Sequence, residues 1–213
     1  MKKLITMIAL TCLCTVSLLG CSNKKSNEGP VNTADQTAEV ATATPALTGK
    51  HHVEIDVNNY GTIKVELDAD VAPITVANFL ELARNNFYDG LTFHRVINGF
   101  MIQGGDPNGN GTGGSANTIK GEFSSNGYEN SISHVKGTIS MARTSIDKDS
   151  ASSQFFICQE DAVYLDGDYA GFGKVTSGLD IVDKIAKETK VEDNNGTVLK
   201  ENQPVINTIK VID

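Results

Sequence analysis

Cysteine is almost absent from the body of this 213-residue sequence. Of the four cysteines, Cys12, Cys14 and Cys21 lie near the N-terminus, and Cys158 stands alone in the rest of the chain. A disulfide framework, or a zinc site with paired cysteine ligands, needs at least two cysteines in one folded unit. Both are therefore excluded for the body of the protein, and we expect Cys158 to be a buried, inert thiol.

Basic residues are also few. Lysine and arginine number 18 against 26 aspartates and glutamates, which gives a net charge of −8. Binding to a nucleic-acid backbone needs clusters of lysine and arginine, so this function is excluded. Only five prolines, and 20 glycines without a repeating period, exclude a collagen-like chain. The sequence has no internal repeat that predicts a solenoid or a propeller.

Long hydrophobic runs are limited to one. Leu4–Leu19 contains 16 residues without a charge and follows a basic pair at residues 2–3. This run is short for a bilayer span but typical of a signal peptide. Its end, Leu18-Leu19-Gly20-Cys21, resembles the bacterial lipobox. That resemblance implies a signal peptide over residues 1–20, a lipid on Cys21, and attachment to the extracytoplasmic side of a cell membrane or outer membrane. The alternative is an ordinary signal peptide or short anchor with an incidental cysteine.

Aromatic residues are missing from residues 22–49. Twenty of these 28 residues are Ser, Thr, Asn, Gln, Gly, Ala or Pro. Such a segment cannot bury enough apolar surface to offset the entropy lost on ordering. We therefore expect Cys21 and a flexible linker to occupy residues 21–49, with a reach of roughly 30 Å. The folded domain is expected over residues 50–213.

The body shows the patterns of short strands and two helices. Apolar residues alternate in 52–57 and 63–67, which predicts a β-hairpin. A helix is predicted from Pro73, with an apolar stripe at every third or fourth residue, and another near 178–188, with a capping pattern at Ser177–Asp180. Further strands are predicted at 92–97, 100–104, 136–142, 154–158, 170–175 and 205–212. This arrangement predicts a mainly β barrel or sandwich with helical caps.

Three stretches of the body carry a recognisable set of residues. They are Phe93–Asp106, Gly137–Arg143 followed by Ser153–Ile157, and Tyr164–Val175. Together they resemble the cyclophilin family of peptidyl-prolyl cis-trans isomerases, over almost all of the predicted domain. The resemblance implies a closed eight-stranded antiparallel β-barrel capped by two α-helices, with the substrate groove on its outer face.

The resemblance also implies roles for single residues. Arg95 corresponds to the catalytic arginine, and Gln103 to the residue that positions the arginine and the substrate backbone. The proline pocket corresponds to Phe100, Met101, Phe156 and Leu165. The other residues expected at the substrate groove are His94, Ala142, Arg143, Gln154, Tyr164 and Tyr169.

These residue types suit the chemistry of the reaction. An X–Pro amide resists rotation by about 18–20 kcal/mol because its C–N bond is conjugated. A twisted amide regains a lone pair on nitrogen, and a donor aimed at this lone pair binds the twisted state more strongly than either planar state. Arg95 is such a donor, always charged and rigid, while an apolar pocket holds the ring. The reaction needs no nucleophile, metal or cofactor.

The sequence departs from the family pattern at Tyr164, where many members have Trp, and at Tyr169, where eukaryotic members often have His. The segment Thr144–Ser152 also differs in length from the commonest eukaryotic form. We therefore expect cyclosporin to bind weakly. The glycine-rich motif at Gly109–Gly114 is interpreted as a loop beside the groove, because no strong helix follows it as a nucleotide site requires.

The sequence therefore predicts a monomeric, cofactor-free isomerase that acts on proline-containing polypeptides. We expect its clients to be secreted or cell-envelope proteins during folding, and its membrane contact to be a lipid on Cys21. The alternative is a peptide-binding chaperone or adhesin module that uses the same groove. The presence of both Arg95 and Gln103 favours the enzyme.

Overall fold

The structure is a computed structural model, and it describes residues 46–213. The predicted signal peptide, Cys21 and most of the predicted linker lie outside the described residues. Leu47 packs against the core, and the Gly49 N–H donates to Asp70 Oδ1 at 2.8 Å. Contacts of the folded domain therefore begin before residue 50. In this part of the chain no helix is long and apolar enough to cross a bilayer.

The predicted hairpin is confirmed. Strands β1 (Lys50–Val57) and β2 (Gly61–Asp68) pair antiparallel over their whole length. The two α-helices are also found where the apolar stripes predict them. The elements that follow the hairpin are α1 (Pro73–Arg84), β3 (Phe93–Ile97), β4 (Met101–Gly104), β5 (Thr138–Met141), β6 (Phe155–Cys158), β7 (Gly171–Ser177), α2 (Leu179–Glu188) and β8 (Ile206–Val211).

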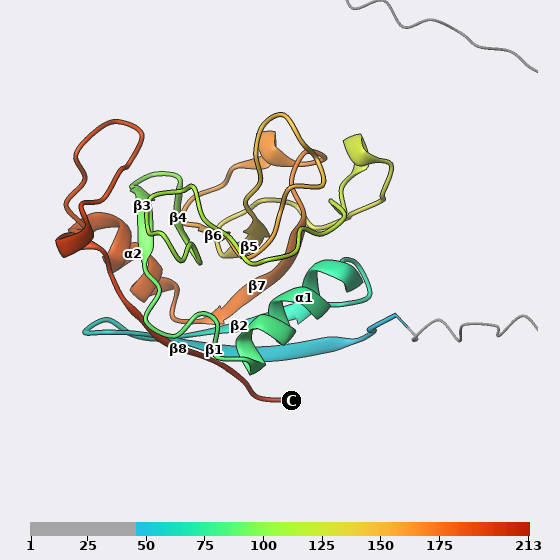
Figure 1. The fold of residues 1–213 in the computed structure, drawn as a ribbon, viewed down its shortest axis with the longest axis horizontal. Helices are drawn as coiled ribbons and strands as arrows, with labels where there is room; N and C mark the ends of the chain where they lie inside the picture. The colour runs from blue at the N-terminus through green and yellow to red at the C-terminus, as the bar shows by residue number, and fades with distance from the viewer. Residues whose placement is uncertain (1–45) are drawn as a thin grey trace, which may run out of the picture. The chain divides into compact units, whose positions relative to one another are not determined.

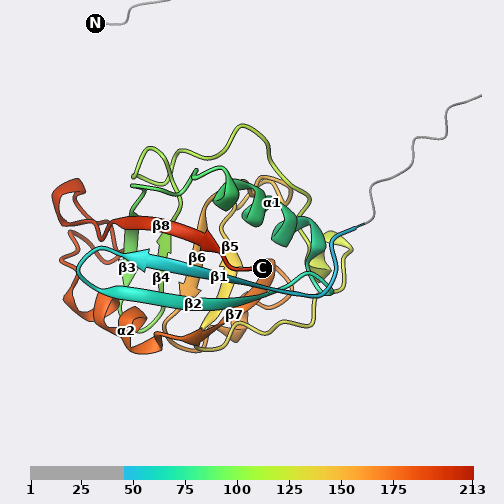
Figure 2. The same cartoon turned by 90° about the horizontal axis from the view of Figure 1, so that it is seen from below.

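All eight strands belong to one antiparallel sheet with the order β3-β4-β6-β5-β7-β2-β1-β8. The sheet curls into a half-barrel, so that β3 and β4 stand at a steep angle to β1, β2 and β8 (Figures 1 and 2). Helix α1 packs against β8 and β2, and α2 packs against β2, β3 and β4. Figure 2 shows the two helices on opposite sides of the β8-β1-β2 group.

The prediction of a closed barrel is wrong, because β3 and β8 are the two edges of the sheet and no ladder joins them. A loop before β8 occupies the free edge of β3 instead. The Val96 N–H donates to Gly196 O at 2.8 Å, and the Val198 N–H donates to His94 O at 3.1 Å. The backbone groups of this edge are thereby satisfied. Near the starts of β3 and β8, Thr92 and Val205 form an isolated bridge, and the Phe93 N–H donates to Pro204 O at 2.9 Å.

The core fills the concave side of the sheet. Ile102 pairs with Val96 on one side and with Ile157 on the other, and Ile157 pairs with Ile139. All four side chains are at most 1% exposed, and burial of each contributes roughly 1.5–3 kcal/mol. The ring of Phe79 from α1 packs onto this row among Tyr88, Phe155 and Phe172. The inward-facing residues of these strands are therefore committed to stability, which leaves the outward-facing residues for function.

The start of α2 differs from the predicted cap. No side chain caps this end, and Gly178 occupies the N-cap with a φ of 92°. A Cβ at this position would lie 2.9 Å from Thr62 O in β2. Close approach of the backbone to β2 therefore requires glycine here and replaces the expected serine cap.

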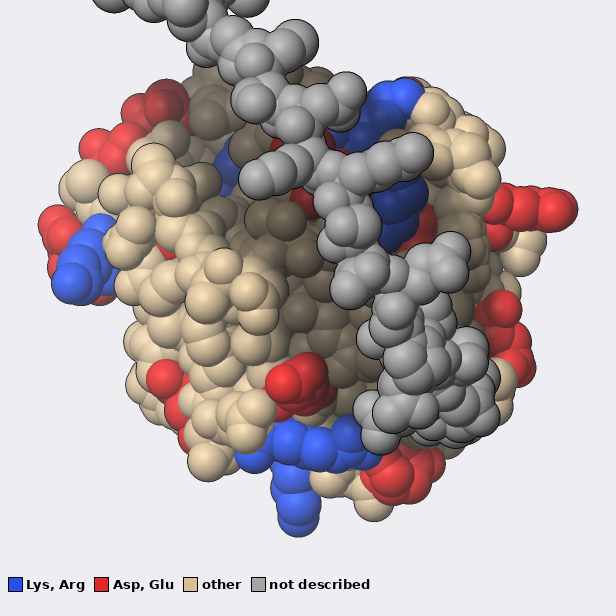
Figure 3. Space-filling view, turned by 45° about the vertical axis from the view of Figure 1, so that its right-hand side comes forward, with Lys and Arg blue, Asp and Glu red and all other residues tan. Residues whose placement is uncertain are grey.

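Charged residues are dispersed on the face shown in Figure 3. On the part of this face that residues 1–45 leave visible, Lys and Arg side chains lie next to Asp and Glu side chains. The visible basic side chains thus have acidic neighbours, in agreement with the net charge of −8.

Candidate active site

A β-bulge in β3 sets the directions of the side chains around Arg95. Phe93 pairs with Gly104, but Arg95 pairs with Gln103, so His94 is an extra residue in this strand. A bulge changes the face to which the following side chains point. Phe93 is accordingly fully buried in the core, whereas Arg95 is half-buried and lines a cavity on the outer face. The bulge therefore turns the arginine out of the core.

The register of the sheet extends this outer face across four strands. Arg95 pairs with Gln103, Gln103 with Phe156, and Phe156 with Ser140. Side chains paired directly across strands point to the same face. Residues from distant parts of the sequence are thus placed side by side, and they form the base of the candidate site.

A cavity of about 240 Å³ lies over this row and brings together most of the predicted groove residues. Its walls are apolar on one side and cationic or amide on the other, which suits an amide flanked by an apolar ring. We call it the proline cavity. It is lined by Arg95, Phe100, Met101, Gln103, Ala142, Arg143, Phe156, Leu165 and Tyr169.

Three hydrogen bonds hold the guanidinium of Arg95. Arg95 Nη1 donates to Gln103 Oε1 at 3.3 Å. Arg95 Nε donates to Asn195 O at 2.8 Å, and Nη2 donates to Asn195 Oδ1 at 3.2 Å. Burial lowers the pKa of Arg95 below its ordinary value, while Tyr169 and Asp193 oppose this shift. An arginine still carries its charge at neutral pH.

Gln103 is itself oriented by a chain of amides. Gln103 Nε2 donates to Gln154 Oε1 at 3.0 Å. Gln154 Nε2 in turn donates to Gly113 O at 2.7 Å and to Gly111 O at 3.2 Å. Because the amide nitrogen of Gln103 is engaged on this side, its oxygen faces Arg95. The glycine-rich loop therefore orients Arg95 through Gln154 and Gln103. Gln154 itself lines a neighbouring cavity of about 320 Å³ rather than the proline cavity.

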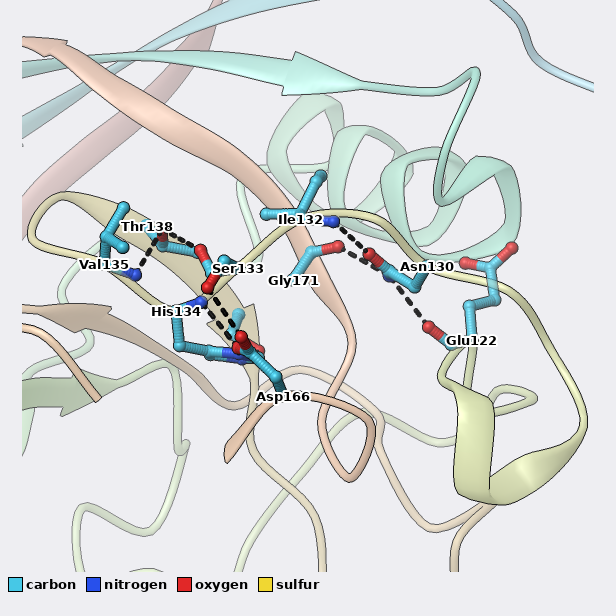
Figure 4. A network of polar contacts seen from close by, with 10 residues as sticks. Glu122, Asn130, Ile132, Ser133, His134, Val135, Thr138, Asp166 and Gly171 are labelled. Atoms are coloured by element: carbon cyan, nitrogen blue, oxygen red, sulfur yellow. Dashed lines mark hydrogen bonds and ion pairs between the residues drawn. The ribbon is translucent and has the colours of Figure 1, made fainter. Parts of the chain in front are cut away.

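A buried histidine supports the floor of the proline cavity. The ring of His134 stacks on Phe156 at a centroid distance of 6.0 Å and an angle of 18°. Its Nδ1 lies 2.7 Å from Asp166 Oδ1, and its backbone N–H donates to the same oxygen at 2.7 Å (Figure 4). Burial lowers the pKa of His134, although Asp166 opposes the shift. Since Asp166 follows Leu165, this pair ties two walls of the cavity together.

His134 also contacts Ser140, which completes a Ser-His-Asp series. His134 Nε2 lies 2.9 Å from Ser140 Oγ. Ser140 is fully buried behind the cavity, with no exposed surface. A nucleophile must reach the carbonyl carbon of its substrate, and this hydroxyl cannot. The series is therefore a structural support and not a hydrolase triad.

Arg143 is held flat against aromatic rings. Its guanidinium carbon lies 4.7 Å from the ring centre of Tyr169 and 5.2 Å from that of Phe123. Arg143 Nε donates to Asp168 O at 2.9 Å. These contacts place a cation and an aromatic ring at one rim of the proline cavity, and Tyr169 meets Phe156 edge-on at 6.0 Å.

Three predicted groove residues lie outside the proline cavity: Gln154, which lines the neighbouring cavity, and His94 and Tyr164. His94, the bulged residue, is 4% exposed and lines a different cavity on the other side of Arg95. Tyr164 is 69% exposed, and its ring lies 5.9 Å from that of Phe100 at the outer rim. Cys158 is buried as predicted, and burial raises the pKa of its thiol to about 12.

Comparison with known proteins agrees with this geometry. The family model described as "Cyclophilin type peptidyl-prolyl cis-trans isomerase/CLD" matches residues 52–211. The chain belongs to the cyclophilin-type peptidyl-prolyl cis-trans isomerases. The family match covers the strands, the helices and every residue of the proline cavity.

Several relatives of this cyclophilin are named peptidyl-prolyl cis-trans isomerases. It is 48% identical over 139 residues to peptidyl-prolyl cis-trans isomerase B of Bacillus subtilis, covering 65% of this chain and 87% of that protein. A Helicobacter pylori peptidyl-prolyl cis-trans isomerase is 46% identical over 136 residues, covering 63% of this chain and 80% of that protein. The enzyme class of this protein is therefore peptidyl-prolyl cis-trans isomerase.

A solved structure supports the fold of this cyclophilin. A Cryptosporidium parvum cyclophilin-type isomerase, crystallised in the presence of the dipeptide Ala-Pro, superposes with a TM-score of 0.67 at 30% identity. The match covers 76% of this chain and 99% of that one.

Sequence reasoning missed Asn195, His134 and Asp166 in this cyclophilin. Asn195 lies in a loop without a periodic pattern, and only its contact with Arg95 reveals it. In the described part of the chain, no group of three or more His, Cys, Asp or Glu residues is arranged to hold a metal ion.

Proposed function

We propose that this isomerase acts by hydrogen bonding from Arg95 to the nitrogen of a twisted X–Pro amide. The supporting observation is the position of Arg95 at the edge of an apolar cavity, held by Gln103 and Asn195. A guanidinium has five N–H donors, and three of them are engaged in these bonds. Two donors therefore remain for the substrate.

The difference between planar and twisted amides gives the acceleration. In the planar states the prolyl nitrogen shares its lone pair with the carbonyl and accepts no hydrogen bond. In the twisted state the lone pair is localised and accepts one from Arg95. An interaction made only in the transition state lowers the barrier without tightening ground-state binding. Met101 and Phe156, which are nearly fully buried, hold the ring still while the preceding carbonyl turns.

The test is the effect of Arg95→Ala on the isomerisation of a proline tetrapeptide. We expect kcat/KM to fall at least about a hundredfold, equal to about 2.7 kcal/mol of transition-state stabilisation. Arg84→Ala, at an exposed position on α1, is the matched control and should keep full activity. Retention of more than about half of the wild-type kcat/KM by folded Arg95→Ala protein would contradict this mechanism. It would favour a role of the groove in peptide binding alone.

We further propose that the enzyme works on folding proteins of the cell envelope, as a monomer tethered by lipid at Cys21. The support is the lipobox-like sequence at Leu18–Cys21 and the polar composition of residues 22–49. Uncatalysed X–Pro isomerisation takes tens to hundreds of seconds and can limit folding. A membrane-held isomerase would meet proteins as they emerge from translocation.

A further inference from the structure

A second cavity, of about 430 Å³, lies on the other side of Arg95 from the proline cavity. Arg95 and Gln103 line both cavities and form the wall between them. The rest of the second cavity comes from the glycine-rich loop and from the segment before β8. We call it the flanking cavity. The lining residues that matter for a ligand are His94, Val198, Leu199 and Lys200.

His94 is the buried polar group of this cavity. Its side chain lines the cavity wall, and the residue is 4% exposed. Neither ring nitrogen has a hydrogen-bond partner among the described residues. A buried polar group without a partner costs roughly 1–3 kcal/mol, and each ring nitrogen has less than 1 Å² of accessible surface. Burial lowers the pKa of His94, so the neutral ring carries one N–H donor.

The charged side chains that line the flanking cavity, Arg95 and Lys200, are both positive. Lys200 forms no ion pair with any residue of 46–213. Two carboxylates, Asp106 and Asp193, lie nearby and keep their negative charge while accepting hydrogen bonds from other groups. Asp106 accepts the backbone N–H groups of Asn108, Asn110 and Gly111, and Asp193 accepts from the backbone and hydroxyl of Thr197. The lining of the cavity thus offers the ammonium group of Lys200 to a ligand, with the charges of Asp106 and Asp193 close by.

We propose that the flanking cavity binds an acidic side chain of the substrate, close to the proline in sequence. This inference rests on the proposed function, because it places the substrate proline in the cavity across Arg95. One extended residue spans at most about 3.3–3.6 Å, so a side chain within three residues of the proline reaches past the shared wall. Val198 and Leu199 contact its methylene groups, and Lys200 donates to its carboxylate. This enzyme would then favour substrates with an acidic residue within three residues of the proline.

The experiment compares pairs of proline peptides that differ only in Glu or Gln, placed at each of three positions on either side of the proline. Isomerisation is measured by NMR exchange, which needs no helper protease. We expect Glu at one position to raise kcat/KM about fivefold or more over Gln, the size of one charge-assisted hydrogen bond. Lys200→Met should reduce this Glu/Gln ratio to near one, and high salt should lower it.

Lys210→Met is the matched control, because Lys210 is exposed on β8 and lines neither cavity. It should leave the rates for both peptides unchanged. A Glu/Gln ratio within about twofold at every position, or a preference that survives Lys200→Met, overturns the proposal. A second result also overturns the proposal. In that result no Glu preference is found, but free glutarate inhibits isomerisation of the Gln peptide and Lys200→Met removes this inhibition. The cavity would then bind a free anion. Isomerase activity that depends on Arg95 persists in each of these outcomes, so the two proposals fail separately.

Discussion

Asn195 holds Arg95 through both its backbone carbonyl and its side-chain amide, although the two residues are 100 positions apart in the sequence. The loop around Asn195 is itself fixed. The Thr197 N–H donates to Asp193 Oδ1 at 3.0 Å, and Gly196 O accepts from the Val96 N–H. The arginine is therefore oriented by a rigid loop and not by its own strand alone.

Asn195→Ala should lower kcat about threefold to tenfold with little change in KM, because one of three hydrogen bonds to Arg95 is lost while the backbone carbonyl remains. Asn195→Asp restores an acceptor oxygen and should recover most of the rate. Steady-state kinetics of both variants check this. Asn194→Ala, next to it in the same exposed loop, is the control. An equal loss in the Asn194 variant would mean that general loosening of the loop is responsible.

Acid should destabilise the domain as pH falls below about 6.5. Burial lowers the pKa of both His94 and His134 from 6.5 in the folded state, so the unfolded chain binds more protons below that pH. Stability is then full above pH 6.5 and is lost as pH falls toward the folded pKa values. His52 acts in the opposite sense, since Asp213 raises its pKa, but it lies at the surface.

Urea unfolding at pH 8, 7, 6 and 5 measures this effect. His134→Asn removes one of the two titrating groups and should flatten the curve, even if the variant is less stable throughout. An unfolding free energy that stays constant from pH 7 to pH 5 in the wild type would show that neither buried histidine resists protonation.

Tyr164→Trp should tighten cyclosporin inhibition by about 1–2 kcal/mol, because a larger ring and an indole N–H replace a smaller phenol at the rim. Tyr164 is mostly exposed and lies outside the proline cavity. Turnover of a small proline peptide should therefore change only a few-fold. The measurement is an inhibition titration of both proteins with one peptide substrate. Equal inhibition constants would assign the weak binding to Thr144–Ser152 instead.

Cys21→Ser should abolish lipid attachment, because the thiol is the lipid acceptor of a lipobox. Metabolic labelling with a radioactive fatty acid, followed by membrane fractionation, checks this. Cys14→Ser is the matched control and should be labelled normally. If the Cys21 variant stays attached to the membrane and is still cleaved before residue 21, the proposal of a lipid at Cys21 is contradicted. Activity per folded molecule should stay the same.

Local patterns predicted most of the fold. The alternation in β4 and β6 already separates Gln103 and Phe156 from Ile102 and Ile157, and the register places the first pair in the groove. The apolar stripe of α1 is likewise buried as the spacing predicts. These features depend on periods of 2.0 and 3.6 residues, which a sequence shows directly.

Other features depend on contacts between distant segments. The barrel stays open because the loop with Gly196 and Val198, and not β8, forms hydrogen bonds with the edge of β3. No periodic pattern in the sequence marks that loop. His94 faces away from the proline cavity because of the bulge, which a strict alternation does not reveal. The role of Gly178 arises from its distance to Thr62. Each of these is a property of packing rather than of local pattern.

The pairing of β1 with β8 has a consequence for biogenesis. The backbone N–H of His52 donates to Asp213 Oδ1 at 2.7 Å, across 161 positions of the chain. Val53 and Ile55 are paired with residues of the final strand. A nascent chain therefore cannot complete its sheet until β8 has left the ribosome. Contacts of such high sequence separation make folding slow. The long-range pairing of β1 therefore awaits the synthesis of β8.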